Sequence, residues 1–529
     1  MVAALRQPAR YPASDFPPGV ERPECLDLVE THISSVILAG GFAYKLKKPV
    51  DLGFLDFTTL EARKFYCEEE LRLNRRTAPS LYLDVVPVTG SHDDPRLGGP
   101  GPVIDYALRM LRFSQDRLLD RLAAKGALHA KEMEDFALSL SRFHANAPRA
   151  DPAGRYASCS QIGETAIQNF SQVEQLLCSS RQTAALRAWT AAQLARLAPV
   201  FAARLRGGFV RECHGDLHLG NLVMLDGVVT AFDCLEFSAQ LRWEDVMSEV
   251  GFLMMDLEAH GLREHAIAFL NRYLEATGDY EGLDVLRFYM VYRAMVRAKV
   301  ACVRAHQDDA DTEARARSGE EFARYLEFAE RAARPARGAF ILMHGLSGSG
   351  KSTIAKSVAG TLHAIHLRSD LERKRLEGLM PLARSGSGVG AGIYGFSATE
   401  RTYGRLAELA TRIASAGYPV IVDATFLDRR HRDRFRALAG QAGFGFGIVS
   451  CVAPHAILRQ RLLRREAAGS DPSEANAKVL EHQIACSDAL APEERPAILE
   501  VDTSLDPRVS SKAASAMARR LGFDCIGMT

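Results

Sequence analysis

The stretch from Ala339 to Thr353 reads AFILMHGLSGSGKST, and it decides the fold of the second part of the chain. Its apolar run, residues 339–343, predicts a buried strand, and the glycines and serines after it predict a loop that leads into a helix near Ser352. The loop has the spacing G-x-x-x-x-G-K-S, in which backbone N–H groups surround phosphate, the lysine adds a charge and the serine hydroxyl binds Mg²⁺. We therefore assign to ATP the residues Gly345, Ser347, Gly348, Ser349, Gly350, Lys351, Ser352 and Thr353, with Ser352 also assigned to the metal.

Strand and helix patterns alternate after this loop. Further apolar runs at residues 364–368, 420–423, 446–452 and 497–502 are separated by helical segments. Such alternation is typical of a parallel sheet covered by helices. The short basic segment RAARPARG precedes the first strand, so we expect a linker at 331–338 and an α/β P-loop NTPase domain at 339–529.

Composition limits the classes of function. A chain of 529 residues exceeds what one hydrophobic core usually supports, and its net charge of +1 offers no general attraction for nucleic acid or an anionic membrane. A nucleic-acid partner stays open through a local basic groove but is not favoured. The ten cysteines form no C-x-x-C pair, and no apolar run reaches the length of a membrane span. We expect a soluble cytoplasmic protein without a membrane partner.

The first part of the chain reads as a small β-rich lobe followed by a larger helical one. Residues 1–24 contain Pro and Arg and predict a loosely ordered lead-in, and Gly40-Gly41 predicts a hairpin turn between two strands. A helix is expected at 58–76, strands at 81–88 and 103–109, and a polar loop at 89–102. Helical patterns dominate 115–206 and 243–334. We take residues 1–330 as one α+β domain with two lobes.

The segment HGDLHLGN, residues 214–221, has the H-x-D-x-x-x-x-N spacing of a kinase catalytic loop. Phosphoryl transfer needs a carboxylate base and oxygen ligands for Mg²⁺. We assign Asp216 as the catalytic base, and Asn221 and Asp233 as metal ligands. Lys45, on the second strand of the hairpin, is assigned to the nucleotide phosphates, with Glu69 or Glu70 of the following helix as its ion-pair partner.

These residues resemble the aminoglycoside phosphotransferase family, which implies a protein-kinase-like fold and phosphorylation of small-molecule hydroxyls. Two departures are that no G-x-G-x-x-G precedes Lys45 and that Cys234-Leu235, not Phe-Gly, follows Asp233. Alternative interpretations remain. Asp216 and Asn221 could simply form a turn, and Lys45 could be a solvated lysine, because Lys47 lies on the same strand face. Histidines 214 and 218 fit an orienting role better than metal binding, and Arg242, Trp243 and Asp245 are expected to stabilise the fold.

The second part of the chain carries its own acids. Asp370 follows the second strand run and is a candidate catalytic base, and Arg373, one helical turn later, would hold an anionic substrate. Asp370 could instead be a helix N-cap. Asp423 ends the apolar run VIVD and is assigned to the metal, as a Walker-B-like acid.

A basic helix precedes the polar segment GSDPSEA and predicts a closing lid, with Arg461 and Arg464 assigned to the nucleotide. A solvated helix face is the alternative for any one arginine. Together these features resemble the small P-loop kinases that include gluconate kinase, 5′-hydroxyl polynucleotide kinases, chloramphenicol phosphotransferase and zeta-type toxins.

The sequence thus predicts a bifunctional ATP-dependent phosphotransferase with two separate Mg·ATP sites, each acting on small-molecule hydroxyl acceptors, one of them anionic. The alternatives are a 5′-hydroxyl nucleic-acid kinase in the second domain and a nucleotide-sensing regulatory ATPase. The three intact polar residues of the first site weigh against a first domain without activity.

Overall fold

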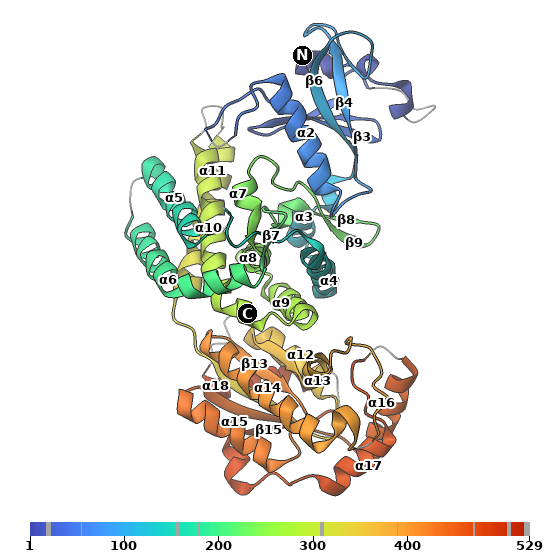
Figure 1. Cartoon of the computed structure of the whole chain (residues 1–529), viewed down its shortest axis with the longest axis vertical. Helices are drawn as coiled ribbons and strands as arrows, with labels where there is room; N and C mark the ends of the chain where they lie inside the picture. The colour runs from blue at the N-terminus through green and yellow to red at the C-terminus, as the bar shows by residue number, and fades with distance from the viewer. Residues whose placement is uncertain are drawn as a thin grey trace. The chain divides into compact units, whose positions relative to one another are not determined.

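The computed structural model describes residues 1–16, 23–53, 55–154, 156, 158–177, 180–306, 312–388, 390–468, 471–504 and 509–522. It divides into two compact units (Figure 1). The first holds Met1–His260 and Phe288–Ala329, and the second holds Gly261–Arg287 and Glu330–Thr529. The sequence-based division placed residues 261–287 in the first domain, whereas the structure builds them into the second unit. None of the described helices has the length and apolarity needed to cross a lipid bilayer.

The first unit begins with a six-stranded antiparallel sheet in the order β1-β2-β3-β6-β4-β5. Its strands are β1 (Asp27–Glu30), β2 (Ser34–Ala39), β3 (Phe42–Lys47), β4 (Tyr82–Gly90), β5 (Pro95–Leu97) and β6 (Val103–Leu111). The expected hairpin at Gly40-Gly41 is confirmed, and Gly40 is required there because its φ is +56° and a Cβ would meet the backbone oxygen of Asp15. The loop expected at 89–102 contains β5, which pairs with the end of β4.

The expectation of a loosely ordered lead-in is wrong for the part of it that the structure describes. A short helix, α1 (Val2–Leu5), and two 3₁₀ turns (Pro8–Arg10 and Ala13–Asp15) pack on the sheet, with Leu5, Tyr11 and Phe16 buried. The hydroxyl of Tyr44 donates to the buried Asp15 carboxylate. The Pro and Arg content of this segment led to the expectation of disorder, although its widely spaced apolar residues pack on the sheet.

Helix α2 (Leu60–Asn74) lies against β4 and β6, as Figure 1 shows. The remaining helices of this unit are α3 (Leu119–Ala124), α4 (Ala130–Asn146), α5 (Cys159–Leu177), α6 (Arg181–Arg206), α7 (Ala239–Arg242), α8 (Val246–Ala259) and most of α10 (Leu283–Ala305) and α11 (Thr312–Ala333). Two small antiparallel pairs lie among them: β7 (Val210–Glu212) with β10 (Trp243–Asp245), and β8 (Leu222–Leu225) with β9 (Val228–Ala231). The sequence of α8, VMSEVGFLMMDLEA, is apolar on nearly every face, and this helix is accordingly buried along most of its length.

The second unit is built on a five-stranded parallel sheet in the order β12-β13-β11-β14-β15. Its strands are β11 (Ala339–His344), β12 (Ile365–Arg368), β13 (Pro419–Asp423), β14 (Gly445–Val452) and β15 (Ile498–Asp502). All five expected strands are present, and the α/β fold class is confirmed. The strand β11 is central and buried from Ala339 to Met343, as its uninterrupted apolar run predicted.

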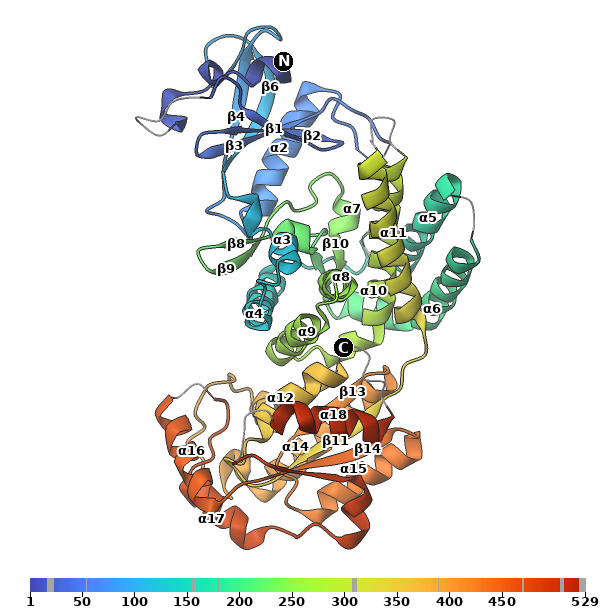
Figure 2. The same ribbon diagram turned by 180° about the vertical axis from the view of Figure 1, so that it is seen from behind.

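Helices cover both faces of this sheet. They are α9 (Arg263–Thr277), α12 (Lys351–Leu362), α14 (Phe396–Ser415), α15 (Arg429–Ala442) and α18 (Val509–Leu521). The other helices of this unit are α13 (Ser369–Leu376), which packs on α14, and α16 (His455–Ala468) and α17 (Ala477–Cys486), which pack on each other. Figure 2 shows α12 and α18 over the sheet, where Val358 and Met517 meet Ile341 in one apolar cluster. The loops at the carboxyl ends of the strands stay free of this packing, and they carry the polar residues described below.

Candidate functional site

The catalytic loop of the first unit brings Asp216 and Asn221 into direct contact. The amide nitrogen of Asn221 donates to Asp216 Oδ2 at 2.9 Å and to the Asp216 backbone oxygen at 3.0 Å. Because the amide nitrogen is used in this way, the amide oxygen of Asn221 is the atom available to a metal ion. The two residues are therefore tied together, and the oxygen ligand that the sequence assigned to Asn221 suits Mg²⁺.

Two acids of helix α8 hold this loop, and the sequence interpretation missed both. Glu249 Oε1 accepts the backbone N–H groups of His214 and Gly215 at 2.6 and 2.8 Å, and Asp256 Oδ2 accepts that of Leu219 at 2.8 Å. The signal was present, because Glu249 and Asp256 interrupt an otherwise apolar helix. A buried carboxylate in such a place needs partners, and backbone N–H groups provide them.

The Asp216 side chain remains a carboxylate near neutral pH. Burial favours its protonated form, but the neighbouring His218 and Arg297 outweigh this effect and hold the pKa of Asp216 well below its ordinary value. Arg297 in turn lies 3.1 Å from His218 Nε2. A deprotonated oxygen beside the acceptor position is what a general base requires.

Lys45 lies between two acids. Its Nζ donates to Glu70 Oε1 at 2.7 Å and to Asp233 Oδ1 at 2.6 Å. The partner in α2 is thus Glu70, while Glu69 pairs with Arg72 and Arg242. The alternative of a solvated lysine is wrong, since the Lys45 side chain is only 11% exposed.

Lys47 is buried beside this group, which the sequence did not indicate. It donates to Glu70 Oε2 at 2.8 Å and also pairs with Glu236, three residues after Asp233. Strand alternation placed Lys45 and Lys47 on one face, and the structure gives both a charged partner on that face.

Asp233 follows β9 with a φ of +62°, a conformation that is uncommon for a residue with a side chain. Its backbone N–H donates to the hydroxyl of Tyr82 at 3.0 Å. Asp233 and Asn221 together offer a carboxylate and an amide oxygen, and Lys45 adds the positive charge. This donor set fits Mg²⁺ with a nucleotide phosphate.

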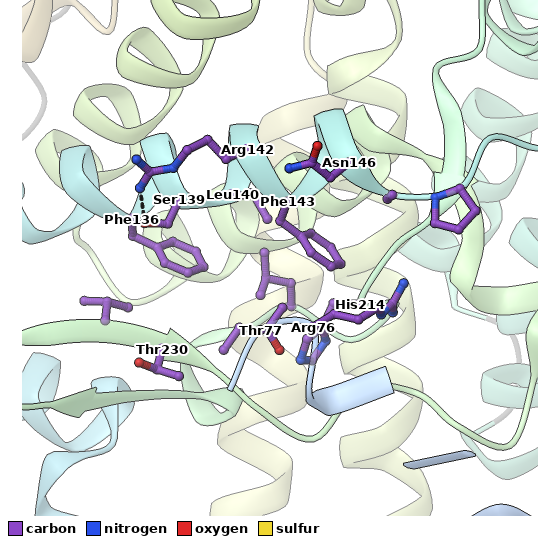
Figure 3. Close-up of a pocket in the computed structure, with 15 residues that line it drawn as sticks. Arg76, Thr77, Phe136, Ser139, Leu140, Arg142, Phe143, Asn146, His214 and Thr230 are labelled. Carbon is purple, nitrogen blue, oxygen red and sulfur yellow. Dashed lines mark hydrogen bonds between the residues drawn. The ribbon is translucent and has the colours of Figure 1, made fainter. Parts of the chain in front are cut away.

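A separate hollow of about 390 Å³ lies behind the catalytic loop (Figure 3). Phe136, Leu140 and Phe143 of α4 form one wall, and His214 of the loop and Arg76 lie across from them. The guanidinium of Arg76 stacks on the Phe143 ring at 5.1 Å. Neither Asp216 nor Asp233 lines this hollow, so it is not the place where phosphate and acceptor would meet.

The phosphate loop of the second unit has backbone geometry that requires glycine. Gly345, Gly348 and Gly350 have φ values of +134°, +82° and +82°. A Cβ on Gly345 would lie 2.4 Å from the Cys451 backbone oxygen, and one on Gly348 would lie 2.8 Å from that of Leu458. The loop is therefore curled as the motif predicts, although the N–H groups of Gly345 and Ser349 donate to the backbone oxygens of Thr425 and Leu346.

Lys351 is the first residue of α12, and its ammonium is bonded to backbone carbonyls. Its Nζ donates to the backbone oxygens of Gly345 and Leu346 at 2.8 and 2.7 Å. Ser349 is buried, and its hydroxyl has no partner among the described residues. An ammonium bonded only to neutral carbonyls and an orphaned hydroxyl both suit a bound phosphate.

The remaining loop residues are held from outside the loop or by the helix. The Ser347 N–H donates to Gln483 Oε1 of α17 at 2.8 Å, a contact that the sequence did not indicate. The Ser349 backbone oxygen accepts the Thr503 hydroxyl at 2.8 Å. Thr353 lies in the first turn of α12 and bonds through its N–H to Gly350.

Asp423 ends β13 and is 6% exposed. Burial raises its pKa, but hydrogen bonds from His366 and Ser352, with the charge of Arg368, lower the pKa of Asp423 to about 2. His366 Nε2 lies 3.1 Å from Asp423 Oδ2. A carboxylate bonded to the Ser352 hydroxyl fits the pair of oxygens that Mg²⁺ needs beside the phosphate loop.

Asp370 and Arg373 both lie on α13 but differ in surroundings. Arg368, not Asp370, is the N-cap of this helix, so the N-cap alternative for Asp370 is wrong. Arg373 is 8% exposed, and its guanidinium donates to the Ile393 backbone oxygen at 2.6 Å and stacks on Tyr394. The structure thus engages Arg373 with the segment before α14, while Asp370 stays partly exposed.

The two lid arginines also differ. Arg461 donates to the Thr503 backbone oxygen at 2.7 Å and to that of Gly348 at 3.4 Å, so it braces the phosphate loop. Arg464 is exposed on α16. In the expected lid loop, Gly469 and Ser470 lie outside the described residues.

One family model matches part of the second unit. Residues 340–490 match the family model of the AAA domain. Over 470 residues the chain is 29% identical to the uncharacterized protein Rv2004c of Mycobacterium tuberculosis, covering 88% of this chain and 91% of the relative. The predicted P-loop domain is confirmed by the family match and by the parallel sheet.

Solved structures similar to the two parts of the chain include one kinase for each. The second part is similar to the APS kinase CysC of M. tuberculosis, solved with AMPPNP and APS (23% identity, 36% of this chain, 99% of that chain, TM-score 0.27). The first is similar to an ethanolamine kinase of Plasmodium vivax (10% identity, 61% and 85%, TM-score 0.38). At TM-scores below 0.5 these likenesses carry no weight for activity.

Proposed function

We propose that the chain is a bifunctional phosphotransferase with two Mg·ATP sites, each transferring the γ-phosphoryl group of ATP to a hydroxyl of a small molecule. The observation that carries the proposal is that each unit has its own set of carboxylates beside a cation. In the first unit Asp233 pairs with Lys45 and Asp216 is bonded to Asn221, and in the second the charges of Asp423 and Asp370 act on the buried Lys351.

In the first unit, Asn221 and Asp233 would hold the metal, and Lys45 would contact nucleotide phosphate. Mg²⁺, when bound, would neutralise phosphate charge. Asp216 would accept the proton of the acceptor hydroxyl, and its contact with Asn221 Nδ2 keeps its carboxylate oriented. Glu249 and Asp256 would keep the loop rigid through the three N–H groups that they accept.

In the second unit, the phosphate loop and Lys351 would bind the nucleotide, and Ser352 and Asp423 would hold the metal. Asp370 would act as the base. The arginines on α13 support an anionic acceptor. The eight described cysteines are all unpaired, which supports a location in the reducing cytoplasm.

The test is an ATP-dependent phosphorylation screen on the full chain, with small hydroxylated metabolites, aminoglycosides and short 5′-hydroxyl oligonucleotides as acceptors. The variants Lys45→Met and Lys351→Ala assign each product to one site. We expect a small-molecule product to disappear with one variant and to persist with the other. Salt-sensitive labelling of oligonucleotides lost with Lys351→Ala would support the nucleic-acid kinase instead. ATP binding without any product would support a regulatory ATPase.

A further inference from the structure

The second unit contains a side chain that bridges the edge of its sheet. The strand β12 lies at the end of the sheet, where backbone groups have no neighbouring strand. Asn271 of α9 fills this place: its amide nitrogen donates to the Ala364 backbone oxygen at 3.0 Å, and its amide oxygen accepts the His366 N–H at 2.8 Å. Both ends of the Asn271 amide are thus used on one strand.

Asn271 holds the backbone of His366, and the ring of His366 contacts the Asp423 carboxylate, which is assigned to the metal. His366 is 7% exposed, and its Nε2 lies 3.1 Å from Asp423 Oδ2. Because a carboxylate only accepts, the ring nitrogen must donate in this contact. Asp423 also accepts the hydroxyl of Ser352. Contacts therefore run without a gap from Asn271 through His366 to the two residues assigned to Mg²⁺.

Further contacts fix helix α9 to the rest of the second unit, so the position of Asn271 does not depend on its own hydrogen bonds alone. Arg375 of α13 donates to the Glu275 backbone oxygen at 2.8 Å. Just after α9, Glu281 and Asp284 pair with Arg412 of α14 at 2.8 and 2.9 Å. These contacts make residues 261–287 a built part of the second unit, although they precede its phosphate loop by about 60 residues.

We propose that Asn271 is a positioning residue for the metal site of the second unit, acting through His366 on Asp423. The proposal rests on the proposed function of that unit. Outer-shell partners that orient metal ligands commonly change metal affinity or activity by about 10- to 100-fold when removed. Asn271 acts one step further out, so its loss should weaken Mg²⁺ binding by about tenfold, at the lower end of that range.

The test uses Asn271→Leu in the full chain, which keeps the side-chain size and removes both hydrogen bonds. ATP affinity is measured by calorimetry across a Mg²⁺ series and in EDTA, with Lys45→Met as background so that the second site is observed. We expect the Mg²⁺ concentration that gives half of the full increase in ATP affinity to rise about tenfold, while the ATP affinity in EDTA is unchanged. Arg272→Gln is the matched control, because the Arg272 side chain pairs with Glu275 on the same helix.

A double variant shows whether the effect passes through His366. If it does, Asn271→Leu combined with His366→Phe should need no more Mg²⁺ than His366→Phe alone. An unchanged Mg²⁺ requirement in Asn271→Leu, or a loss of affinity in EDTA as large as that with Mg²⁺, would overturn the proposal. Lys351→Ala tests the proposed function of the second site separately from the role of Asn271. If ATP binding at this site stays intact in Lys351→Ala, the proposed function of the site is wrong, whatever the result with Asn271→Leu.

Discussion

Lys47 and Glu70 form an ion pair that solvent does not reach, with Lys47 Nζ 2.8 Å from Glu70 Oε2 and both side chains fully buried. Lys45 uses the other oxygen of the same carboxylate. Burial raises the pKa of Glu70, but the charges of Lys45 and Lys47 outweigh this effect and hold its pKa below the ordinary value. Glu70 is thereby held charged between them, and the placement of Lys45 depends on Lys47.

Replacing Lys47 should therefore affect stability more than replacing Lys45. Lys47→Met leaves Glu236 and one Glu70 oxygen buried without their cation, and breaking such a pair costs about 3–5 kcal/mol. In Lys45→Met, Glu70 keeps Lys47, so the loss should be smaller while ATP affinity at the first site falls. Urea unfolding gives the first quantity, and calorimetry in a Lys351→Ala background gives the second. Wild-type ATP affinity in Lys45→Met would remove that lysine from the nucleotide site.

Asp216→Asn should lower turnover at the first site by roughly 10²–10⁴ and leave ATP affinity nearly intact, because the base is lost and the metal ligands remain. Asp233→Asn should instead weaken Mg·ATP binding. Both are measured with the acceptor found in the phosphorylation screen. Wild-type turnover in both variants would mean that the catalytic interpretation of this loop is wrong.

Lys351→Ala should abolish ATP binding at the second site of the full chain, because the ammonium is the cation that the phosphate loop itself supplies. The measurement is calorimetry in a Lys45→Met background. Lys356→Ala, five residues further along α12, is the control. Equal ATP affinity in the Lys351 variant and this control would remove the phosphate-site assignment.

The strands, the hairpin and the phosphate loop could be predicted because each depends on local pattern. Five apolar runs between helices define the parallel sheet, and the glycines at 345 and 350 are needed for the backbone path itself. The choice between Glu69 and Glu70 could not be made in this way. Neighbours on a helix point about 100° apart, and only the packed position of α2 shows which one faces Lys45.

Other parts of the site depend on long-range packing. The pattern of α9 is that of an amphipathic helix, and such a pattern does not say which core it covers. Asn271 and Gln483 look like surface amides in the sequence, yet one bonds β12 and the other the phosphate loop. The expectation that Arg373 faces the acceptor remains a prediction, since its guanidinium donates to the Ile393 backbone oxygen and the Thr399 hydroxyl.

For the acceptor of the second site, Asp370→Asn should depress kcat with acceptor binding retained. Arg373→Ala should raise the acceptor KM with little change in the KM for ATP. Thr399→Val removes only one bond of Arg373 and is the matched control. If Thr399→Val reproduces the KM change, Arg373 acts by holding the segment before α14 and not by binding the acceptor.

His344, at the end of β11, should make stability depend on pH. Burial lowers its pKa to about 4, and the charges of Arg432 and Lys351 act in the same direction. The unfolded chain, with the ordinary value of 6.5, binds the proton first, so the stability that neutral His344 contributes is present above pH 6.5 and is lost as the pH falls toward 4. The difference in unfolding free energy between wild type and His344→Gln, from urea unfolding, should change across this window. A constant difference would contradict the expectation.

The chain passes three times from one compact unit to the other, after His260, Arg287 and Ala329. A protease that cuts after the exposed Arg337 therefore does not divide the chain into two independent domains. The amino-terminal piece would keep residues 261–287, in which Asn271 bonds to His366 of β12 and Glu281 and Asp284 pair with Arg412, and both β12 and Arg412 belong to the other piece. The two fragments would give two bands on a denaturing gel but would migrate together as one species on a native gel.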